Sequence, residues 1–516
     1  MAESALRRFV THGRTVCRNG GVRCLFTEAS DPEALSDVKT TTSVKSFSEL
    51  PGPRGLPIVG TVTEYFRKAN KGQMHEVQRK FHRQYGKIFK EKFGSYDNVS
   101  VGDPSLVEEI LRAEGKYPHR PPYEAWVLYN ELRKRRGGIM TANGEQWRGN
   151  RSAMNPKLLR PKAVGDFVDG INSVVTDFVD RLRFLKDREG EGEFVPHLPN
   201  ELNKFTMEAL GYVLLDTRLG CLERQVDPKI QNFITSIATM FLTGHQMMAF
   251  TKVYKNLRLK TWRMHVKAWD TIYEIAQEYI EAKMEDVAER LSGDVQEGDR
   301  VDFLTYLVGN GQMSRQEIYE NITEVLLGGV DTAANSMSFL LYSLAKNTDA
   351  QDTLRDEVDS VLDGKTCTYD DLQRMPYLKA VVKETLRLYP PIPINARILQ
   401  EDTIVDNTLI HKGTCVLLNN YTMSRDPSIF SNPDQFVPER WLKAEAKEWH
   451  PFSILPFGYG ARSCVGRRIA ETEIYLATIR VCQNFNLKLS DKFDITPSVR
   501  TQLTAGAELP ILFEER

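Results

Sequence analysis

The sequence has few of the features that hold a small secreted domain together or carry a chain across a membrane. It has seven cysteines in 516 residues, an odd number scattered along the chain without a CxxC pair, which argues against a disulfide framework and a structural zinc site. It has no uninterrupted run of about 18 apolar residues, so we expect no membrane-spanning helix. Its formal net charge of -1 gives no global electrostatic support for binding nucleic acid, and we expect no such partner.

Acidic residues are also missing from one segment, the N-terminus between Glu3 and Glu28. Arginine recurs there among small and apolar residues, at Arg7, Arg8, Arg14, Arg18 and Arg23. This composition predicts a mitochondrial transit peptide over residues 1–27, and the alternative is a disordered basic tail. Residues 28–50 are polar and acidic and predict a linker. The prolines of 51–57 then start a folded body that we expect to span residues 51–516.

What is present along that body is mostly helical periodicity. Ser314-Arg-Gln-Glu317 is a capping box that predicts the start of a long helix reaching Leu344. Pro376 suits the first turn of another helix, which Pro390 ends. Short strand-like stretches occupy residues 87–93, 98–101, 404–409 and 415–418, and the last two are separated by turn residues and could pair. The expected fold class is mainly α with small β-sheets.

One cysteine lies in a glycine-rich loop, Phe457-Gly-Tyr-Gly-Ala-Arg-Ser-Cys464-Val-Gly466. A cysteine that binds a metal must be a thiolate, which positive charge and a following helix N-terminus stabilise. Arg462 supplies the charge, and a helical pattern begins after Gly466. Such a cysteine alone is more often a small buried residue. The full spacing Phe-x-x-Gly-x-Arg-x-Cys-x-Gly, however, resembles the haem-ligand loop of cytochromes P-450. The resemblance implies haem b with Cys464 as its iron ligand, bound between the long helix and this loop.

A second motif of that family is Glu384-Thr-Leu-Arg387, whose ends face the same side of a helix. Alone it would be a routine surface ion pair that contributes little. It is followed by Pro438-Glu-Arg440, and the resemblance implies that Glu384, Arg387 and Arg440 form a buried network behind the haem loop. Because a buried charge without its partner is costly, we expect Glu384→Ala to lose haem or the fold.

A third motif, Gly328-Gly-Val-Asp-Thr-Ala-Ala334, lies midway along the long helix. Two glycines inside a helix cost about 1 kcal/mol each relative to alanine, and close approach of a planar haem would account for them. The resemblance makes Asp331 and Thr332 the acid–alcohol pair that passes protons to bound oxygen. Ala333 occupies a position where the family usually has a second hydroxyl. A helix packed through small residues is the alternative.

Further residues offer hydrogen-bond donors for the haem propionates. Trp147 and Arg151 match the family's W-x-x-x-R, and Arg397 and Arg462 add two guanidinium groups. Phe457 opens the ligand loop and completes the expected haem contacts. For any one of these arginines, a solvated side chain is the alternative.

A basic patch is expected beside the cysteine loop. Lys379 and Lys383 are at i and i+4 on one helix face, and Arg467 and Arg468 follow the loop. They resemble the patch by which mitochondrial members receive electrons from an acidic [2Fe–2S] ferredoxin, itself reduced by an NADPH-dependent reductase. Solvated surface lysines are the alternative. This resemblance implies a peripheral protein on the matrix side of the inner mitochondrial membrane.

Several stretches are most similar to sterol 27-hydroxylase and the vitamin D hydroxylases, which implies hydroxylation of an unactivated C–H bond in a sterol or secosteroid. By analogy, the pocket is lined by Trp126, Met247, Ile392 and Ile394. Residues 240–262 mix apolar and basic side chains and suit either a membrane interface or a core-packed helix pair. The stretches that carry the similarity are Glu114-Gly-Lys-Tyr-Pro118, Gly329-Val-Asp-Thr332, residues 378–390 and Ile394-Asn-Ala-Arg397.

Other functions stay open at this stage. The nearest is a different mitochondrial steroid hydroxylase. A thiolate-haem isomerase or a peroxide-driven enzyme would need neither ferredoxin nor O₂, and the acid–alcohol pair and basic patch argue against it. A non-catalytic haem- or sterol-binding protein would bind haem without forming an NADPH-dependent product.

Overall fold

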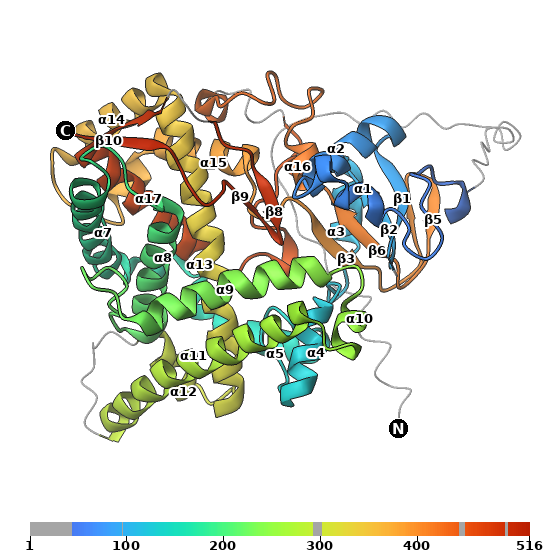
Figure 1. Ribbon diagram of the computed structural model, residues 1–516, viewed down its shortest axis with the longest axis horizontal. Coiled ribbons are helices and arrows are strands. Elements are labelled where there is room, and N and C mark those ends of the chain that lie inside the picture. Colours follow the sequence, from blue (N-terminus) through green and yellow to red (C-terminus); the bar gives the residue numbers. More distant parts are fainter. Residues whose placement is uncertain (1–43, 95, 293–301, 443–448, 491–493) are drawn as a thin grey trace, which may run out of the picture. The chain divides into compact units, whose positions relative to one another are not determined.

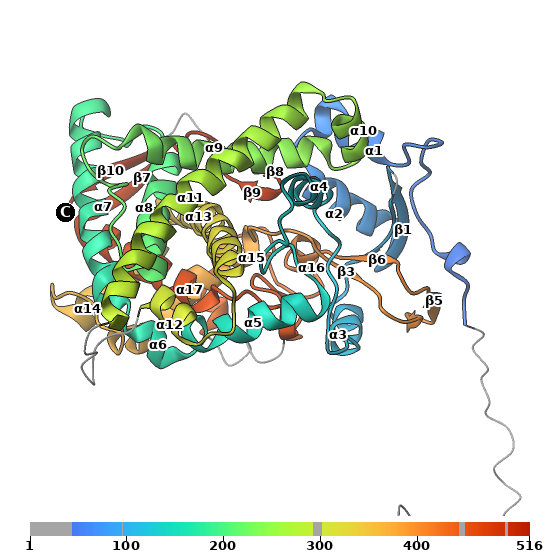
Figure 2. The ribbon, with the colours of Figure 1, turned by 90° about the horizontal axis from the view of Figure 1, so that it is seen from below.

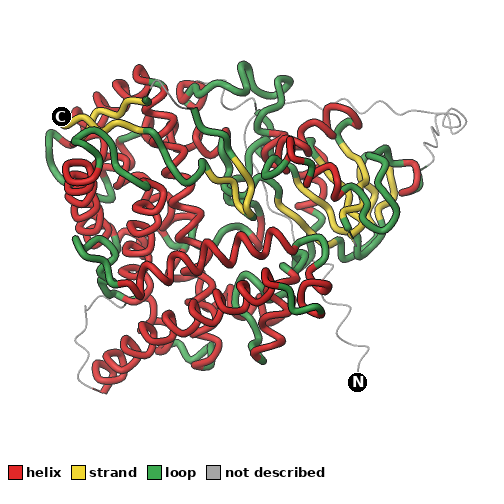
Figure 3. The backbone as a smooth tube through the Cα atoms, viewed as in Figure 1, coloured by secondary structure: helices red, strands yellow, loops and turns green. Residues whose placement is uncertain are grey.

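The computed structural model describes residues 44–94, 96–292, 302–442, 449–490 and 494–516. The predicted transit peptide, residues 1–27, lies outside these. Residues 44–516 form one compact unit in which helices predominate, as predicted, and most of the strands gather at one side (Figures 1 and 3).

The α-helices and short 3-10 helices follow the chain in this order: η1 (Phe47–Glu49), α1 (Val62–Phe66), η2 (Lys68–Asn70), α2 (Met74–Tyr85), α3 (Pro104–Arg112), α4 (Glu124–Arg133), α5 (Gly144–Leu158), α6 (Pro161–Gly165), α7 (Val168–Glu189), α8 (Leu198–Leu215), α9 (Pro228–Met247), α10 (Thr251–Asn256), α11 (Lys260–Ser292), α12 (Phe303–Gly309), α13 (Arg315–Lys346), α14 (Thr348–Leu362), η3 (Asp371–Arg374), α15 (Pro376–Leu388), α16 (Asn420–Met423), η4 (Pro438–Trp441), η6 (Gly460–Arg462) and α17 (Arg467–Asn484). The strands are β1 (Ile88–Phe93), β2 (Tyr96–Val101), β3 (Asn395–Ile398), β4 (Thr403–Val405), β5 (Thr408–Ile410), β6 (Cys415–Leu418), β7 (Phe485–Leu489), β8 (Ser498–Arg500), β9 (Gln502–Thr504) and β10 (Ile511–Glu515).

Helix α13 is the long helix that the sequence predicts, and it begins with the predicted capping box. The Ser314 hydroxyl accepts a hydrogen bond from the Glu317 N–H, and the Glu317 carboxylate accepts one from the Ser314 N–H at 2.9 Å. Along its 32 residues α13 packs against α8, α11, α15 and α17. Figure 2 shows it nearly end-on among these neighbours. Most of its apolar side chains belong to the largest hydrophobic core, so α13 is the axis around which the helical part is built.

The main sheet has four strands in the order β1-β2-β6-β3. The predicted strand at residues 415–418 is β6, which pairs parallel to β2 and antiparallel to β3. The pairing of 404–409 with 415–418, which the sequence allowed, does not occur. Residues 403–410 instead fold on themselves as the β4–β5 hairpin, because Asp406 and Asn407 adopt φ of +48° and +57°, the left-handed pair that a two-residue hairpin turn requires.

The packed body begins at Val44, earlier than the expected boundary at Pro51. Lys45 N–H donates to the Asn407 carbonyl at 2.8 Å, and a capping box starts η1 at Ser46. Leu50 is buried in the core around the main sheet. Polar composition suggested a linker here, but backbone pairing with the β4–β5 hairpin fixes residues 44–50 to the fold.

None of the described helices is long and apolar enough to cross a membrane. The five cysteines in the described ranges are free thiols.

Candidate functional site

The cysteine loop, Phe457–Gly466, contains η6 and leads directly into α17. Gly458 and Gly460 both have φ of +69°, a conformation that glycine adopts without strain, and the Cys464 N–H donates to the Phe457 carbonyl at 2.8 Å. Gly466 is the N-cap of α17. The turns therefore place Cys464 immediately before the positive end of a helix, where a thiolate is favoured.

Arginines from four different segments surround this loop. Arg151 of α5 donates to the Ser463 carbonyl at 2.7 Å, and Arg120, from the loop before α4, donates to the Arg462 carbonyl at 2.5 Å. Arg462 reaches away from the loop and donates to the Pro118 carbonyl at 2.9 Å, with its guanidinium 4.0 Å from the centre of the buried Trp147 ring. The fourth, Arg397, is a buried residue of β3.

These four guanidinium groups carry more charge than their surroundings neutralise. Burial, together with the neighbouring arginines, lowers the pKa of Arg462 to about 9 and that of Arg120 to about 10. Within the described residues, the only carboxylate that hydrogen-bonds to any of the four is Glu114, the partner of Arg397. Four positive charges and one negative charge leave three positive charges.

The residues fit a haem. The two propionates of a haem carry two negative charges, which oppose the excess positive charge of the arginines. The charge of a thiolate ligand would be balanced by the single net positive charge of a ferric iron–porphyrin core. Arg151 Nε and Arg462 Nη1 are buried donors without an acceptor in the described part of the chain, and buried donors normally have one. Propionate oxygens are acceptors that guanidinium groups bind well.

The Cys464 thiol experiences opposing influences. It is accessible to solvent, unlike the buried Cys221, Cys367 and Cys482, yet protein atoms crowd its wider surroundings. That crowding raises the pKa of the Cys464 thiol, while the Gly466 N–H, Arg151 and Arg120 act to lower it. Coordination to a metal ion would deprotonate such a thiol.

The acid–alcohol pair lies on α13. Burial raises the pKa of the Asp331 carboxyl to about 7. The Thr332 hydroxyl donates to the Gly328 carbonyl one turn earlier at 2.7 Å, a bond from side chain to backbone that competes with the helix ladder. A carboxyl group that titrates near neutrality beside a hydroxyl has the composition of a proton relay.

The two glycines before this pair make room for side chains. A Cβ on Gly328 would lie 3.0 Å from Met140 Sδ, and one on Gly329 would lie 2.5 Å from Leu210 of α8. The Met140 and Leu210 side chains occupy space that a Cβ at these positions would enter. The expectation that these glycines admit a planar haem stays a prediction.

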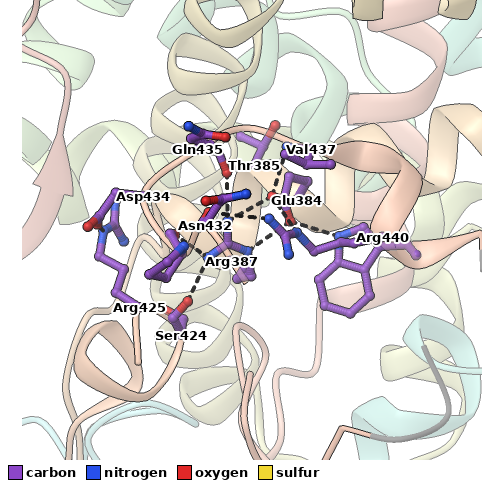
Figure 4. Close-up of polar contacts among 12 residues, drawn as sticks. Glu384, Thr385, Arg387, Ser424, Arg425, Asn432, Asp434, Gln435, Val437 and Arg440 are labelled. Atoms are coloured by element: carbon purple, nitrogen blue, oxygen red, sulfur yellow. Dashed lines mark hydrogen bonds and ion pairs between the residues drawn. The ribbon is translucent and has the colours of Figure 1, made fainter. Parts of the chain in front are cut away.

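The predicted charge network among Glu384, Arg387 and Arg440 is present (Figure 4). Arg387 donates to Glu384 twice, at 2.8 and 2.7 Å, and Arg440 donates to the same carboxylate at 3.0 Å. All three side chains are buried. The sequence did not indicate a fourth partner, the Trp441 indole, which donates to Glu384 at 2.9 Å. Arg387 also donates to the carbonyls of Ser424, Pro433 and Gln435, so the network ties α15 to the chain leading to η4.

The four basic residues expected in the patch beside the cysteine loop each contact other side chains or the backbone. Lys383 is exposed, with Nζ 3.9 Å from the centre of the Trp441 ring, and both burial and nearby Arg467 lower its pKa. Arg467 pairs with Glu471 one turn along α17 at 3.0 Å. The remaining two also have polar contacts: Lys379 donates to the Gln373 side chain at 3.1 Å and Arg468 to the Leu159 carbonyl at 3.0 Å. Lys383 and Arg467 thus share a surface beside the cysteine loop.

The residues expected to line the substrate pocket fall into two pairs. Trp126 is 2% exposed and packs against Phe241 and Trp269, and Met247 is fully buried in the same core. Ile392 and Ile394 are only partly buried. Side chains of the protein therefore fill the space around Trp126, whereas the Ile392 and Ile394 side chains remain partly exposed to solvent.

The apolar side chains expected at a membrane interface are mostly inside. Phe241 and Met247 belong to the main core, and Met248 and Phe250 pack against a smaller core with α1, α2 and β1. The core-packed alternative is therefore correct for these residues. The exposed apolar residues of this region follow Phe250 in the sequence and are Val253, Leu257, Leu259 and Met264. A second exposed apolar group lies in or just before α1 and consists of Leu56, Ile58 and Phe66.

Sequence reasoning missed several residues of the site. Arg120 follows the Glu114–Pro118 stretch, which carried the family similarity, and its position between Pro118 and Pro121 was the available signal. Glu114 was in that stretch without a role, and pairing with a β3 residue 283 positions away leaves no mark in the local sequence.

Comparison with known proteins identifies the family of the chain. The cytochrome P450 family model matches residues 50–512. The chain is 35% identical over 484 residues to the mitochondrial 1,25-dihydroxyvitamin D(3) 24-hydroxylase of Rattus norvegicus, covering 93% of this chain and 92% of the relative. It is 36% identical over 479 residues to the mitochondrial 25-hydroxyvitamin D-1 alpha hydroxylase of Mus musculus (92% and 94%). Similarity to the mitochondrial sterol 26-hydroxylase of Rattus norvegicus is 34% over 509 residues (95% and 94%).

Proposed function

Because the chain belongs to the cytochrome P450 family, and is therefore a monooxygenase with haem b as its cofactor, we propose that it hydroxylates an unactivated C–H bond of a sterol or secosteroid. We propose Cys464 as the thiolate ligand of the haem iron. The observation that carries the proposal is the excess of three positive charges among the arginines around the cysteine loop. A bound haem with a thiolate ligand supplies oxygen activation.

The protein's own groups hold the haem and control protons. Arg120, Arg151 and Arg462 would bind the propionates, with Trp147 supporting Arg462 from below its guanidinium plane. Arg397 is held by Glu114 and would add a further donor. Phe457 would position the loop through its carbonyl, which already accepts the Cys464 N–H.

Asp331 and Thr332 would deliver protons to the oxygen-binding side. A carboxyl group with a pKa of about 7 is present in both protonation states at neutral pH, so it can accept and donate protons with little free-energy change. Thr332 keeps its hydroxyl hydrogen on the Gly328 carbonyl, which leaves its oxygen free to accept a hydrogen bond. The Ala333 side chain offers no second hydroxyl beside this pair.

We further propose that electrons come from a [2Fe–2S] ferredoxin that its NADPH-dependent reductase reduces. Lys383 and Arg467 share the surface next to Phe457, whose ring lies 5.3 Å from the Arg467 guanidinium, and Lys379 and Arg468 extend it. An acidic protein docked here would sit on the cysteine side of the haem. Opposite charges across such a contact mainly increase the association rate and make it sensitive to salt.

The proposed location is the matrix side of the inner mitochondrial membrane, as a peripheral protein. The three relatives described above are named as mitochondrial enzymes. Around α10, the exposed apolar residues Val253 and Leu257 alternate with Lys252, Lys255 and Arg258, a combination that suits the headgroup region of a bilayer. We propose that an apolar substrate enters from the bilayer at this surface around α10. Ile392 and Ile394, which are partly exposed and directly precede β3, would contact it inside the protein.

Reconstitution tests the function. The purified holoprotein with ferredoxin, its reductase and NADPH should hydroxylate cholesterol or 25-hydroxyvitamin D3, and turnover should fall steeply with added salt. Lys383→Ala should slow reduction of the haem, while Lys412→Ala, which removes an exposed lysine before β6, should not. Haem binding without any NADPH-dependent product from a wider panel of sterols would instead favour a carrier, and product formed from peroxide alone would favour a peroxide-driven enzyme.

A further inference from the structure

A fully buried carboxylate on α13 holds the loop that precedes α5. Glu324 accepts hydrogen bonds from the N–H groups of Gly138 at 2.8 Å, Met140 at 2.7 Å and Thr141 at 3.3 Å. The Thr141 hydroxyl donates a fourth at 2.6 Å. One side chain therefore satisfies the backbone of a segment that has no regular secondary structure of its own.

Neighbouring groups confine the same loop from both sides. One turn earlier on α13, Glu320 accepts from the Arg136 N–H at 3.2 Å. From α5, the Gln146 side chain donates to the carbonyls of Arg136 and Gly137 at 3.1 and 2.8 Å. A Cβ on Gly138 would lie 2.8 Å from the Glu320 carbonyl oxygen and 2.9 Å from a carboxylate oxygen of Glu324. Only glycine lets the loop approach α13 this closely.

The held loop carries a side chain to the catalytic turn of α13. Met140 Sδ lies 3.0 Å from the position of a Cβ on Gly328, whose carbonyl accepts the Thr332 hydroxyl. Glu324, Gly328 and Asp331 are at i, i+4 and i+7, so they share one face of the helix. The carboxylate thus fixes the loop at one end of this face, and Met140 contacts the turn at the other.

A carboxylate is a costly choice for a purely structural anchor. Burial raises the pKa of Glu324, and only the Thr141 hydroxyl and the three loop N–H groups lower it. A buried charge is tolerated when its hydrogen bonds are complete, so withdrawal of the loop would leave that charge unsatisfied. The charge therefore favours one loop position over the alternatives.

We propose that Glu324 is a positioning residue for the hydroxylation: by fixing residues 136–141 on α13 it sets Met140 against the Gly328–Thr332 turn, and Met140 limits which substrate carbon reaches the oxygen. This rests on the proposed function, because the substrate carbon has meaning only if the chain hydroxylates a sterol or secosteroid. The loop contacts themselves are independent of the substrate.

The test compares three variants of the holoenzyme with a matched control. Glu324→Gln places an amide N–H₂ against N–H donors, and Gly138→Ala pushes the loop off an unchanged carboxylate. Both should speed amide hydrogen exchange at residues 138, 140 and 141, weaken binding of 25-hydroxyvitamin D3 by about tenfold and change the ratio of hydroxylated products. Met140→Ala should change the product ratio while amide exchange stays as in the wild type. The control, Glu91→Gln, alters another buried carboxylate, which accepts from Thr61, Tyr65 and Gln78 in the β1 region.

Three results would overturn the proposal. They are unchanged amide exchange at residues 138, 140 and 141 in Glu324→Gln, an unchanged product ratio in both Gly138→Ala and Met140→Ala, or an equal change of exchange and product ratio in Glu91→Gln. Retention of the thiolate-type ferrous–CO spectrum in all variants separates a misplaced loop from a lost haem. If the wild-type protein hydroxylates neither 25-hydroxyvitamin D3 nor cholesterol, the proposed function fails, and faster amide exchange in Glu324→Gln still reports whether the carboxylate holds the loop.

Discussion

Arg397 of β3 donates through Nε to the carboxylate of Glu114. This pairing leaves the other three arginines around the Cys464 loop without a carboxylate partner among the described residues. The site is therefore arranged to receive negative charge, and each element of this arrangement can be tested separately.

The Arg397–Glu114 pair can be broken in two ways. Arg397→Ala leaves Glu114 buried without its cation, and loss of one partner of a buried pair costs about 3–5 kcal/mol of unfolding free energy. The double variant with Glu114→Gln should recover most of that stability but still release haem faster than the wild type, because a propionate donor is gone. Urea unfolding and haem transfer to apomyoglobin measure the two effects. Wild-type haem retention in the double variant would show that Arg397 does not hold the haem.

The Glu384 network predicts a graded loss of stability. Glu384→Ala removes the one carboxylate that two buried arginines share, so we expect a loss of about 3–5 kcal/mol and poor haem incorporation. Trp441→Phe removes one donor to the same carboxylate, and a hydrogen bond to a charged group contributes about 1.5–3 kcal/mol. Denaturant unfolding of both variants would rank them, and equal losses would contradict the central place of Glu384.

Thr332→Ala should uncouple the reaction, because protons would no longer pass through a hydroxyl at this position. The variant should consume NADPH while forming less product and more hydrogen peroxide, and Thr332→Ser should restore the wild-type ratio. Product, NADPH and peroxide are measured in one reconstituted assay. Unchanged product per NADPH in Thr332→Ala would show that the relay takes another route.

Asp331 gives the stability of the protein a specific pH dependence. Its pKa of about 7 in the folded protein lies above its ordinary value, so between these two values the folded state binds a proton that the unfolded chain has released. Stability conferred by this group therefore decreases as pH rises toward 7 and is constant above it. The unfolding free energy of the wild type, relative to Asp331→Asn, should fall between pH 5 and 7 and level off by pH 8. A difference independent of pH would mean that Asp331 titrates at its ordinary value.

The parts of the fold that depend on local chemistry could be predicted from sequence. The Ser314–Glu317 box and Pro376 mark the starts of α13 and α15 because caps and first-turn prolines act within a few residues. Residues 404–409 were misassigned as one strand because the turn at Asp406 depends on left-handed φ values rather than on hydrophobicity. Whether such a stretch forms one strand or a hairpin depends on its tertiary contacts.

For the site, the family resemblance of the motifs predicted roles for Cys464, Asp331 and the Glu384 network, but not the partners that come from distant segments. Glu114 meets Arg397, and Glu324 meets the loop at Gly138, across 283 and 186 residues. Neither pairing leaves a periodic signal in the sequence, because each depends on how β3, α13 and the loops pack. The contact between Met140 and the Gly328 position could not be predicted for the same reason, since the two residues are 188 positions apart.

The most direct test of the account is the ferrous–CO spectrum of Cys464→Ser. Serine lacks the sulfur ligand, so the thiolate-type band should be lost, with residual haem held only by the arginines. Cys415→Ser, a change at a partly buried free cysteine of β6, serves as the matched control and should keep the wild-type spectrum. A thiolate-type spectrum from Cys464→Ser would contradict the account, because another cysteine would then be the haem ligand.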